Sequence, residues 1–363
     1  MDQQESHPLT EIDTLARGSS DKASHRIDEM QHYLQSLTLP NPRDEPFTYA
    51  IVTELCEQIE ATCAELKIPL HSGVAFGSDP DVNLEASLFP VPFTDASVIT
   101  LSGGFISFCS HISKVIAQSL IHERKGELIG ICIEPGRVYE FVGSDVELKR
   151  FWVEVIGAYA FGSGPLNVAP RFVAKPASFT RIQILRSMEL FALTHEYAHH
   201  IGRHGKSQSA EAGGNPDAKN EELAADMLAI ALTRHIGAKD QPQNLFAMSG
   251  AGAVILLKCL ECVRRTRQIF RNGVENVELS ATHPSVSERI AAFEKLDQSP
   301  SEVENTVYKQ MRNDFSEIID SFWVKLRPFF VTMHQDGLRP EADTTLNSNS
   351  VSSHLERDFI SRF

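Results

Sequence analysis

The segment that most restricts how this chain can fold is LTHEYAHHIGRHG, residues 193–205, which holds four of the fourteen histidines. Counting back from His195 in helical steps meets Phe191, Met188 and Ile184, so an apolar stripe leads into the histidines. We therefore expect one long helix here. One face of it should be buried until the helix turns polar at its C-terminal end.

The spacing of the histidines predicts a metal site. His195 and His199 are one helical turn apart, so both rings can bind a single zinc ion from the same side. Glu196 follows the first histidine and is the expected general base beside an activated water. His200 and His204 lie off this face, because one residue turns a helix by about 100°, and we do not expect them to bind the metal. The alternative interpretation is an accidental match in a histidine-rich chain.

Two candidates can supply a third ligand. In the pattern H-E-x-x-H-x-x-G-x-x-H, the glycine falls on Gly202, but His204 is one residue too early for the last position. The second candidate is NEELAADMLAIAL, which is expected to form a helix capped by Asn220. We favour Glu222 as the metal ligand and expect Asp226, one turn later, to accept the ring N–H of a bound histidine, most plausibly the first. Alternatively, these residues are a solvated acidic first turn.

Three motifs together give a family resemblance: HEYAHH, EELAAD and THPSVSERIAAF. This set resembles the gluzincin metallopeptidases of the CAAX-prenyl endopeptidase and HtpX type. The residues that match are His195, Glu196, His199, Glu222, Asp226, His283, Pro284, Glu288 and Arg289. The resemblance implies an α+β, mostly helical, zincin-like core with a small sheet and an active-site helix pair. It also implies one Zn²⁺ per chain and hydrolysis of protein or peptide substrates.

The resemblance assigns further roles. His283 would stabilise the oxyanion or act as a removable zinc ligand, although a turn-capping role is an equal alternative. Arg289 would contact the reacting groups or, by a slightly preferred interpretation, pair with Asp226 or Glu222. The segment SVITLSGGFISF is similar to the family's strand beside the active site, so Ser102, Gly103 and Gly104 are expected to pair with an extended substrate.

The chain also departs from the family. An extra stretch of roughly 60 residues, at about 121–178, separates the expected substrate strand from the metal helix. Membrane-spanning helices and an export signal are not found either, so prenylated substrates are not implied. We expect a disordered N-terminal arm at 1–45, a single zincin-like domain at 46–336 and a disordered tail at 337–363.

The composition of the chain limits which binding partners and which cellular compartment we expect. The formal charge is −14, from 34 basic and 48 acidic side chains, which would repel a phosphate backbone, so nucleic acid is not expected as a partner. Six cysteines are few for this length and lie mostly in apolar stretches, which is typical of a reducing compartment. The sequence thus predicts a cytoplasmic protein without a membrane span, and it does not indicate an oligomeric state.

Three functions remain open from sequence. The favoured one is a zinc endopeptidase. The second is a zinc-site sensor or binding module without turnover, against which Glu196 argues, because a structural site needs no base beside an open coordination position. The third is a metal-free helical interaction protein.

Overall fold

A computed structural model describes residues 48–339, except for 71–72, 80–83, 85, 92–93, 126–127, 163–167, 203–217, 276–283 and 298–300. The predicted N-terminal arm, and the predicted tail from residue 340 onward, lie outside the described residues. Within these ranges the protein is mostly helical with a small sheet, which confirms the coarse prediction of fold class. None of the described helices combines the length and apolar character needed to cross a membrane.

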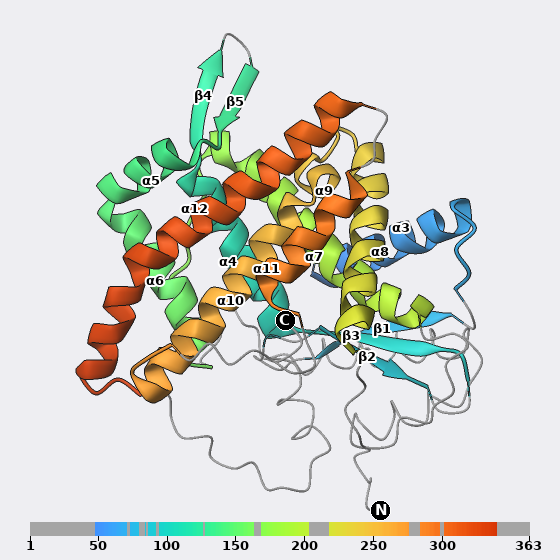
Figure 1. Ribbon diagram of the computed structural model, residues 1–363, viewed down its shortest axis with the longest axis horizontal. Helices are drawn as coiled ribbons and strands as arrows, with labels where there is room; N and C mark the ends of the chain where they lie inside the picture. Colours follow the sequence, from blue (N-terminus) through green and yellow to red (C-terminus); the bar gives the residue numbers. More distant parts are fainter. Residues whose placement is uncertain are drawn as a thin grey trace, which may run out of the picture.

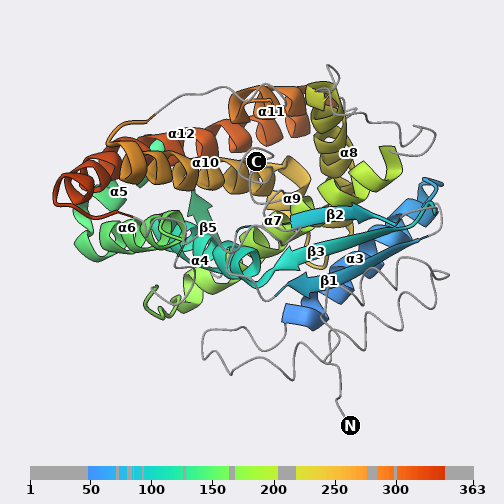
Figure 2. The same ribbon diagram turned by 90° about the horizontal axis from the view of Figure 1, so that it is seen from below.

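Helices form the body of the molecule (Figure 1). They are α3 (Thr48–Glu65), α4 (Gly103–Ser119), α5 (Pro135–Ser144), α6 (Val146–Ala160), α7 (Lys175–Gly202), α8 (Ala218–Lys239), α9 (Leu245–Ser249), α10 (Ala251–Asn272), α11 (Val286–Phe293) and α12 (Glu302–Gln335), with a 3₁₀ turn η2 (Glu294–Leu296). The α10 and α12 helices pack along each other, and both views show α5 and α6 at the end of the molecule remote from the three-stranded sheet (Figures 1 and 2).

The three-stranded sheet consists of β1 (Val74–Asp79), β2 (Ala86–Pro90) and β3 (Ser97–Ser102), in the order β1-β3-β2. The β3 strand is central: it pairs in parallel with β1, with Val74 opposite Ser97, and antiparallel with β2, with Ala86 opposite Leu101. A separate hairpin is formed by β4 (Ile121–Lys125) and β5 (Leu128–Cys132).

The metal helix predicted from sequence is α7, and it runs through the core. Its apolar stripe packs as expected, with Ile184, Met188 and Phe191 fully buried. Around it lie α4, α8 and α10. The contact with α10 is close, because a Cβ added at Gly252 would lie 2.1 Å from the Ser187 Oγ. A side chain at position 252 would therefore push α10 away from α7.

The extra stretch at 121–178 folds onto this body. Its described part forms the β4–β5 hairpin, α5, α6 and the first residues of α7. Helix α6 packs against α4 and α10, and α5 packs against α12. The α5 and α6 helices of this stretch thus extend the helical core at the end away from the three-stranded sheet (Figures 1 and 2).

Candidate metal centre

The C-terminal turns of α7 carry the two histidines into a mostly enclosed position. His195 is 3% exposed and His199 is half-buried. They lie one turn apart, so their rings emerge from one face of the helix. Their Nε2 atoms are 3.0 Å apart.

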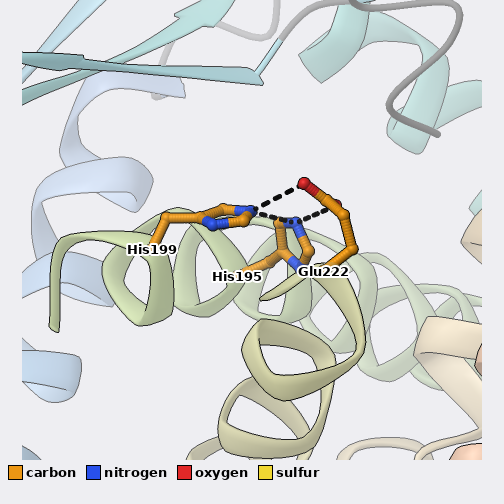
Figure 3. Close-up of side chains that lie close together, drawn as sticks. All are labelled: His195, His199 and Glu222. Atoms are coloured by element: carbon orange, nitrogen blue, oxygen red, sulfur yellow. Dashed lines mark hydrogen bonds and ion pairs between the residues drawn. The ribbon is translucent and has the colours of Figure 1, made fainter. Parts of the chain in front are cut away.

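The first turns of α8 bring a carboxylate to these rings. Glu222 Oε2 lies 3.5 Å from His195 Nε2, and Glu222 Oε1 lies 3.4 Å from His199 Nε2. Figure 3 shows the three side chains converging from the two helices. Helix α8 begins at Ala218, two residues before Asn220, so the prediction that Asn220 caps it is wrong.

The three donor atoms fit a single metal ion. Two imidazole nitrogens and a carboxylate oxygen all lie within 4.8 Å of one another. In a tetrahedral site with bonds of about 2.0–2.1 Å, neighbouring ligand atoms are about 3.3 Å apart. The two Nε2 atoms are 3.0 Å apart, and each imidazole has one of the two Glu222 oxygens at 3.4 or 3.5 Å, which is close to that value. His195, His199 and Glu222 are therefore able to hold a metal ion. The donor set suits zinc, and it also occurs with Fe(II).

A buried chain of contacts supports His195 from behind. Its Nδ1 lies 3.0 Å from Asp226 Oδ1, which favours the tautomer that leaves Nε2 free to bind a metal. Asp226 is itself held by Arg289, whose Nε donates to Oδ2 at 2.6 Å and whose second guanidinium nitrogen donates to Oδ1. Asp226 and Arg289 are 0% and 1% exposed. The structure thus places Arg289 as a partner of Asp226.

The electrostatics of the centre suit a cation. Burial lowers the pKa of His195, but the carboxylates of Asp226 and Glu222 more than reverse this and raise it to about 9. Burial raises the pKa of Glu222, while the two imidazoles lower it to well below its ordinary value. Burial likewise raises the pKa of Asp226, and Arg289 lowers it below its ordinary value. Without a metal, the proton on His195 takes the place of the positive charge.

Glu196 follows His195 on α7 and is 5% exposed. Burial lowers the pKa of Arg289, and Asp226 raises it above its ordinary value, with smaller contributions in the same direction from Glu222 and Glu196. Glu196 therefore lies within electrostatic reach of the same buried cluster.

His200 has a role that the sequence did not reveal. Its Nδ1 lies 2.8 Å from the Ser97 Oγ, and both side chains are buried. This hydrogen bond joins the metal helix to the first residue of β3. The sequence indicated only that His200 lies off the helix face that carries His195 and His199. His204 lies outside the described residues.

The prediction of the substrate strand is wrong in two respects. The strand ends at Ser102, whose Oγ accepts from the Phe105 N–H and caps α4, so Gly103 and Gly104 are the first residues of a helix. In addition, β3 pairs with β1 along its length and with β2 from Ser97 to Leu101, so this part of the strand has no free edge for a peptide.

The His-Pro segment is only partly placed. His283 lies outside the described residues, so both roles expected for it stay predictions. After Pro284, Ser285 caps α11 in a reciprocal arrangement: its Oγ accepts from the Glu288 N–H, and the Glu288 carboxylate accepts from the Ser285 N–H. This capped turn sets the start of the helix that carries Arg289 to Asp226.

Comparison with protein-family profiles, curated proteins and solved structures finds no match to this chain.

Proposed function

We propose that this chain is a zinc-dependent endopeptidase that hydrolyses peptide bonds with an activated water and with Glu196 as general base. The observation that best supports this is the convergence of His195, His199 and Glu222, whose possible ligand atoms all lie within 4.8 Å of one another. Three protein ligands leave a coordination position open, as catalytic zinc sites do, whereas structural sites have four. The resemblance to gluzincins in HEYAHH, EELAAD and the His-Pro segment supports the same reaction class.

Each residue of the cluster has a distinct part in this proposal. His195, His199 and Glu222 hold the zinc, which when bound lowers the pKa of water and polarises the substrate carbonyl. Asp226 fixes the tautomer and orientation of His195, and Arg289 keeps Asp226 ionised and in place. Glu196 takes a proton from the attacking water and returns it to the leaving amine.

The edge of β2 is our candidate for pairing with an extended substrate. In the described sheet, β1 and β2 both have β3 on one side only, and α7 packs against β2 and β3. An edge strand presents unpaired N–H and C=O groups along its length, which is what capture of a peptide by strand addition requires.

Replacing Glu196 by Gln tests the proposal. The isosteric change keeps the shape of the side chain and removes the base, so peptide hydrolysis should fall by about 100- to 10,000-fold with one metal per chain retained. The matched control is Glu189→Gln, which alters another buried glutamate of α7 and should leave turnover within a few-fold. Peptides from digested cell extract, read by mass spectrometry for new termini, serve as substrate.

Other outcomes of this experiment would favour the other functions. Stoichiometric metal in the wild-type protein without any cleavage would indicate a sensor or binding module. Protein that binds no divalent metal would indicate a helical interaction protein. Equal cleavage by wild type and Glu196→Gln would contradict the proposed base.

A further inference from the structure

The last turn of α7 is joined to the three-stranded sheet by one of its own side chains. Among the final four residues of this helix, His200 is the buried one, and its Nδ1 lies 2.8 Å from the Ser97 Oγ. Helix ends fray more easily than helix interiors, because their last carbonyl groups have no partner within the helix. His199 lies in the same turn. A contact that holds this turn therefore also bears on a proposed metal ligand.

Ser97 lies at a well-held position of the sheet. It is the first residue of β3, opposite Val74 of β1 and Pro90 of β2. The connection between β2 and β3 is closed at the same end, where the Val91 N–H donates to the Ala96 carbonyl at 2.9 Å. Ser97 and the end of β2 are therefore parts of one hydrogen-bonded unit.

The proposed metal ligands do not by themselves fix a zinc ion relative to the sheet, because His195 and His199 come from α7 and Glu222 comes from α8. The edge of β2, our candidate for pairing with a substrate, belongs to the sheet. A paired peptide can be cleaved only if one of its carbonyl groups lies beside the metal. A misplacement of about 1 Å can cost about 100-fold in rate. The placement of the end of α7 along β2 therefore matters for cleavage.

We infer that His200 is a positioning residue for an extended substrate. Its hydrogen bond to Ser97 holds the metal-binding turn of α7 at a fixed place along β2, so that a peptide paired with β2 presents a carbonyl group to the zinc. The bond suits this role because both side chains are buried, and a buried polar group that loses its partner is costly. The inference rests on the proposed endopeptidase function, and it gives His200 no contact with substrate or metal.

Two substitutions of almost equal size test this inference. In His200→Asn, the side-chain amide lies where Nδ1 was and can still form a hydrogen bond with Ser97. His200→Leu has nearly the same shape as His200→Asn but cannot form that bond. The substrate is a peptide that the wild-type protein cleaves, used at full length and trimmed to two residues on each side of the cut. Trimming removes most of the residues that could pair with β2.

The expected result is a loss that depends on peptide length. His200→Leu should lower kcat/KM for the full-length peptide about 10- to 100-fold and leave that for the trimmed peptide within a few-fold. His200→Asn should remain near wild type on both. Ser97→Ala should behave like His200→Leu, and the double variant should be no worse than either single variant, because both substitutions remove the same bond.

Zinc analysis and thermal melting establish that each variant compared is folded and loaded. Ser97→Ala removes only a hydroxyl group, so it carries the test if His200→Leu does not fold.

Two outcomes would overturn the inference and leave the proposed function intact. Equal losses on the full-length and trimmed peptides would show that His200 only supports the fold. Equal activity of the Asn and Leu variants would show that the hydrogen bond does not affect cleavage. Zinc-loaded wild-type protein that cleaves no peptide would instead contradict the proposed function, and this inference with it.

Discussion

Among the described residues, an aspartate pairs with arginine in a partly buried cluster around Asp297 and in the buried metal cluster, and the two differ in what else they contain. In the first cluster, Asp297 accepts hydrogen bonds from Arg234 and Arg312. One further nitrogen of each guanidinium donates to a backbone carbonyl, from Arg234 to Leu296 at 2.8 Å and from Arg312 to Ser249 at 2.7 Å. This cluster joins α8, α9, α12 and the residues around η2, and its two arginines share one carboxylate and two backbone carbonyls.

The metal cluster, which consists of Arg289, Asp226, His195, His199 and Glu222, also contains an arginine–aspartate pair, Arg289 and Asp226. Its contacts continue beyond that pair. Asp226 also lies 3.0 Å from His195, and beyond that ring the Nε2 atoms of His195 and His199 and the two Glu222 oxygens lie 3.0 to 3.5 Å from their nearest partners. Donor atoms gathered in this way could hold a metal ion between them. The comparison teaches that buried opposite charges do not by themselves mark a site, whereas donors converging on one point do.

The largest effect should come from removing a ligand. His195→Ala deletes one of three donors, so zinc affinity should fall by at least about 1,000-fold, and peptide cleavage should fall with it. Equilibrium dialysis with metal analysis measures this. Retention of one tight zinc per chain in the variant would show that the metal lies elsewhere.

A substitution in the Asp297 cluster should change folding stability instead of zinc binding. Asp297→Asn leaves Arg234 and Arg312 without their carboxylate, which should lower the free energy of unfolding by about 3–5 kcal/mol. The zinc content of the folded variant should be unchanged. Urea unfolding and metal analysis check the two parts, and loss of zinc from the folded variant would erase the distinction between the clusters.

A smaller effect on zinc affinity and turnover is expected for Arg289, which contacts Asp226 rather than the proposed metal. Arg289→Lys keeps the charge but loses the two-pronged contact with Asp226, so zinc affinity or turnover should fall about 10- to 100-fold. The matched control is Arg312→Lys, which makes the same change in the Asp297 cluster and should leave zinc affinity unchanged. Equal effects of the two variants on zinc binding would contradict a specific role for Arg289.

The pH dependence of zinc affinity gives a further test of the metal cluster. Because the pKa of His195 in the metal-free protein is raised from 6.5 to about 9, its ring is protonated at neutral pH and must lose that proton to bind zinc. Zinc affinity should rise about tenfold per pH unit toward pH 9 and then level off, with one proton released at pH 7. The raised pKa also stabilises the metal-free fold below pH 6.5, and that contribution is lost as pH rises through about 9.

Calorimetry in buffers of different ionisation enthalpy measures the proton release. Binding that releases no proton at pH 7 would show that His195 is neutral before the metal arrives.

Sequence reasoning predicted the local features of the site well, because they depend on helical periodicity. The apolar stripe through Ile184 and Met188 places α7 in the core, and the one-turn spacing places His195 and His199 on one face. The motif resemblance pointed to Glu222 on α8. What periodicity could not supply was the order of strands in the sheet.

The wrong prediction of the substrate strand illustrates this limit. The pattern SVITLS gives a strand, but whether that strand is central or at an edge depends on which other strands pair with it, and the alternation within SVITLS does not encode this. The end of the strand was also missed, because the Ser102 cap competes with an apolar run that continues through Phe105 and Ile106 into α4. The hydrogen bond between Ser97 and His200 joins residues 103 apart and left no local signal.

X-ray absorption spectroscopy of the zinc-loaded protein tests the central claim most directly. The account predicts a first coordination sphere of nitrogen and oxygen atoms at about 2.0–2.2 Å, with the scattering of two imidazole rings, one of which disappears in His195→Ala. A sulfur contribution at about 2.3 Å, or a spectrum unchanged by that substitution, would contradict it.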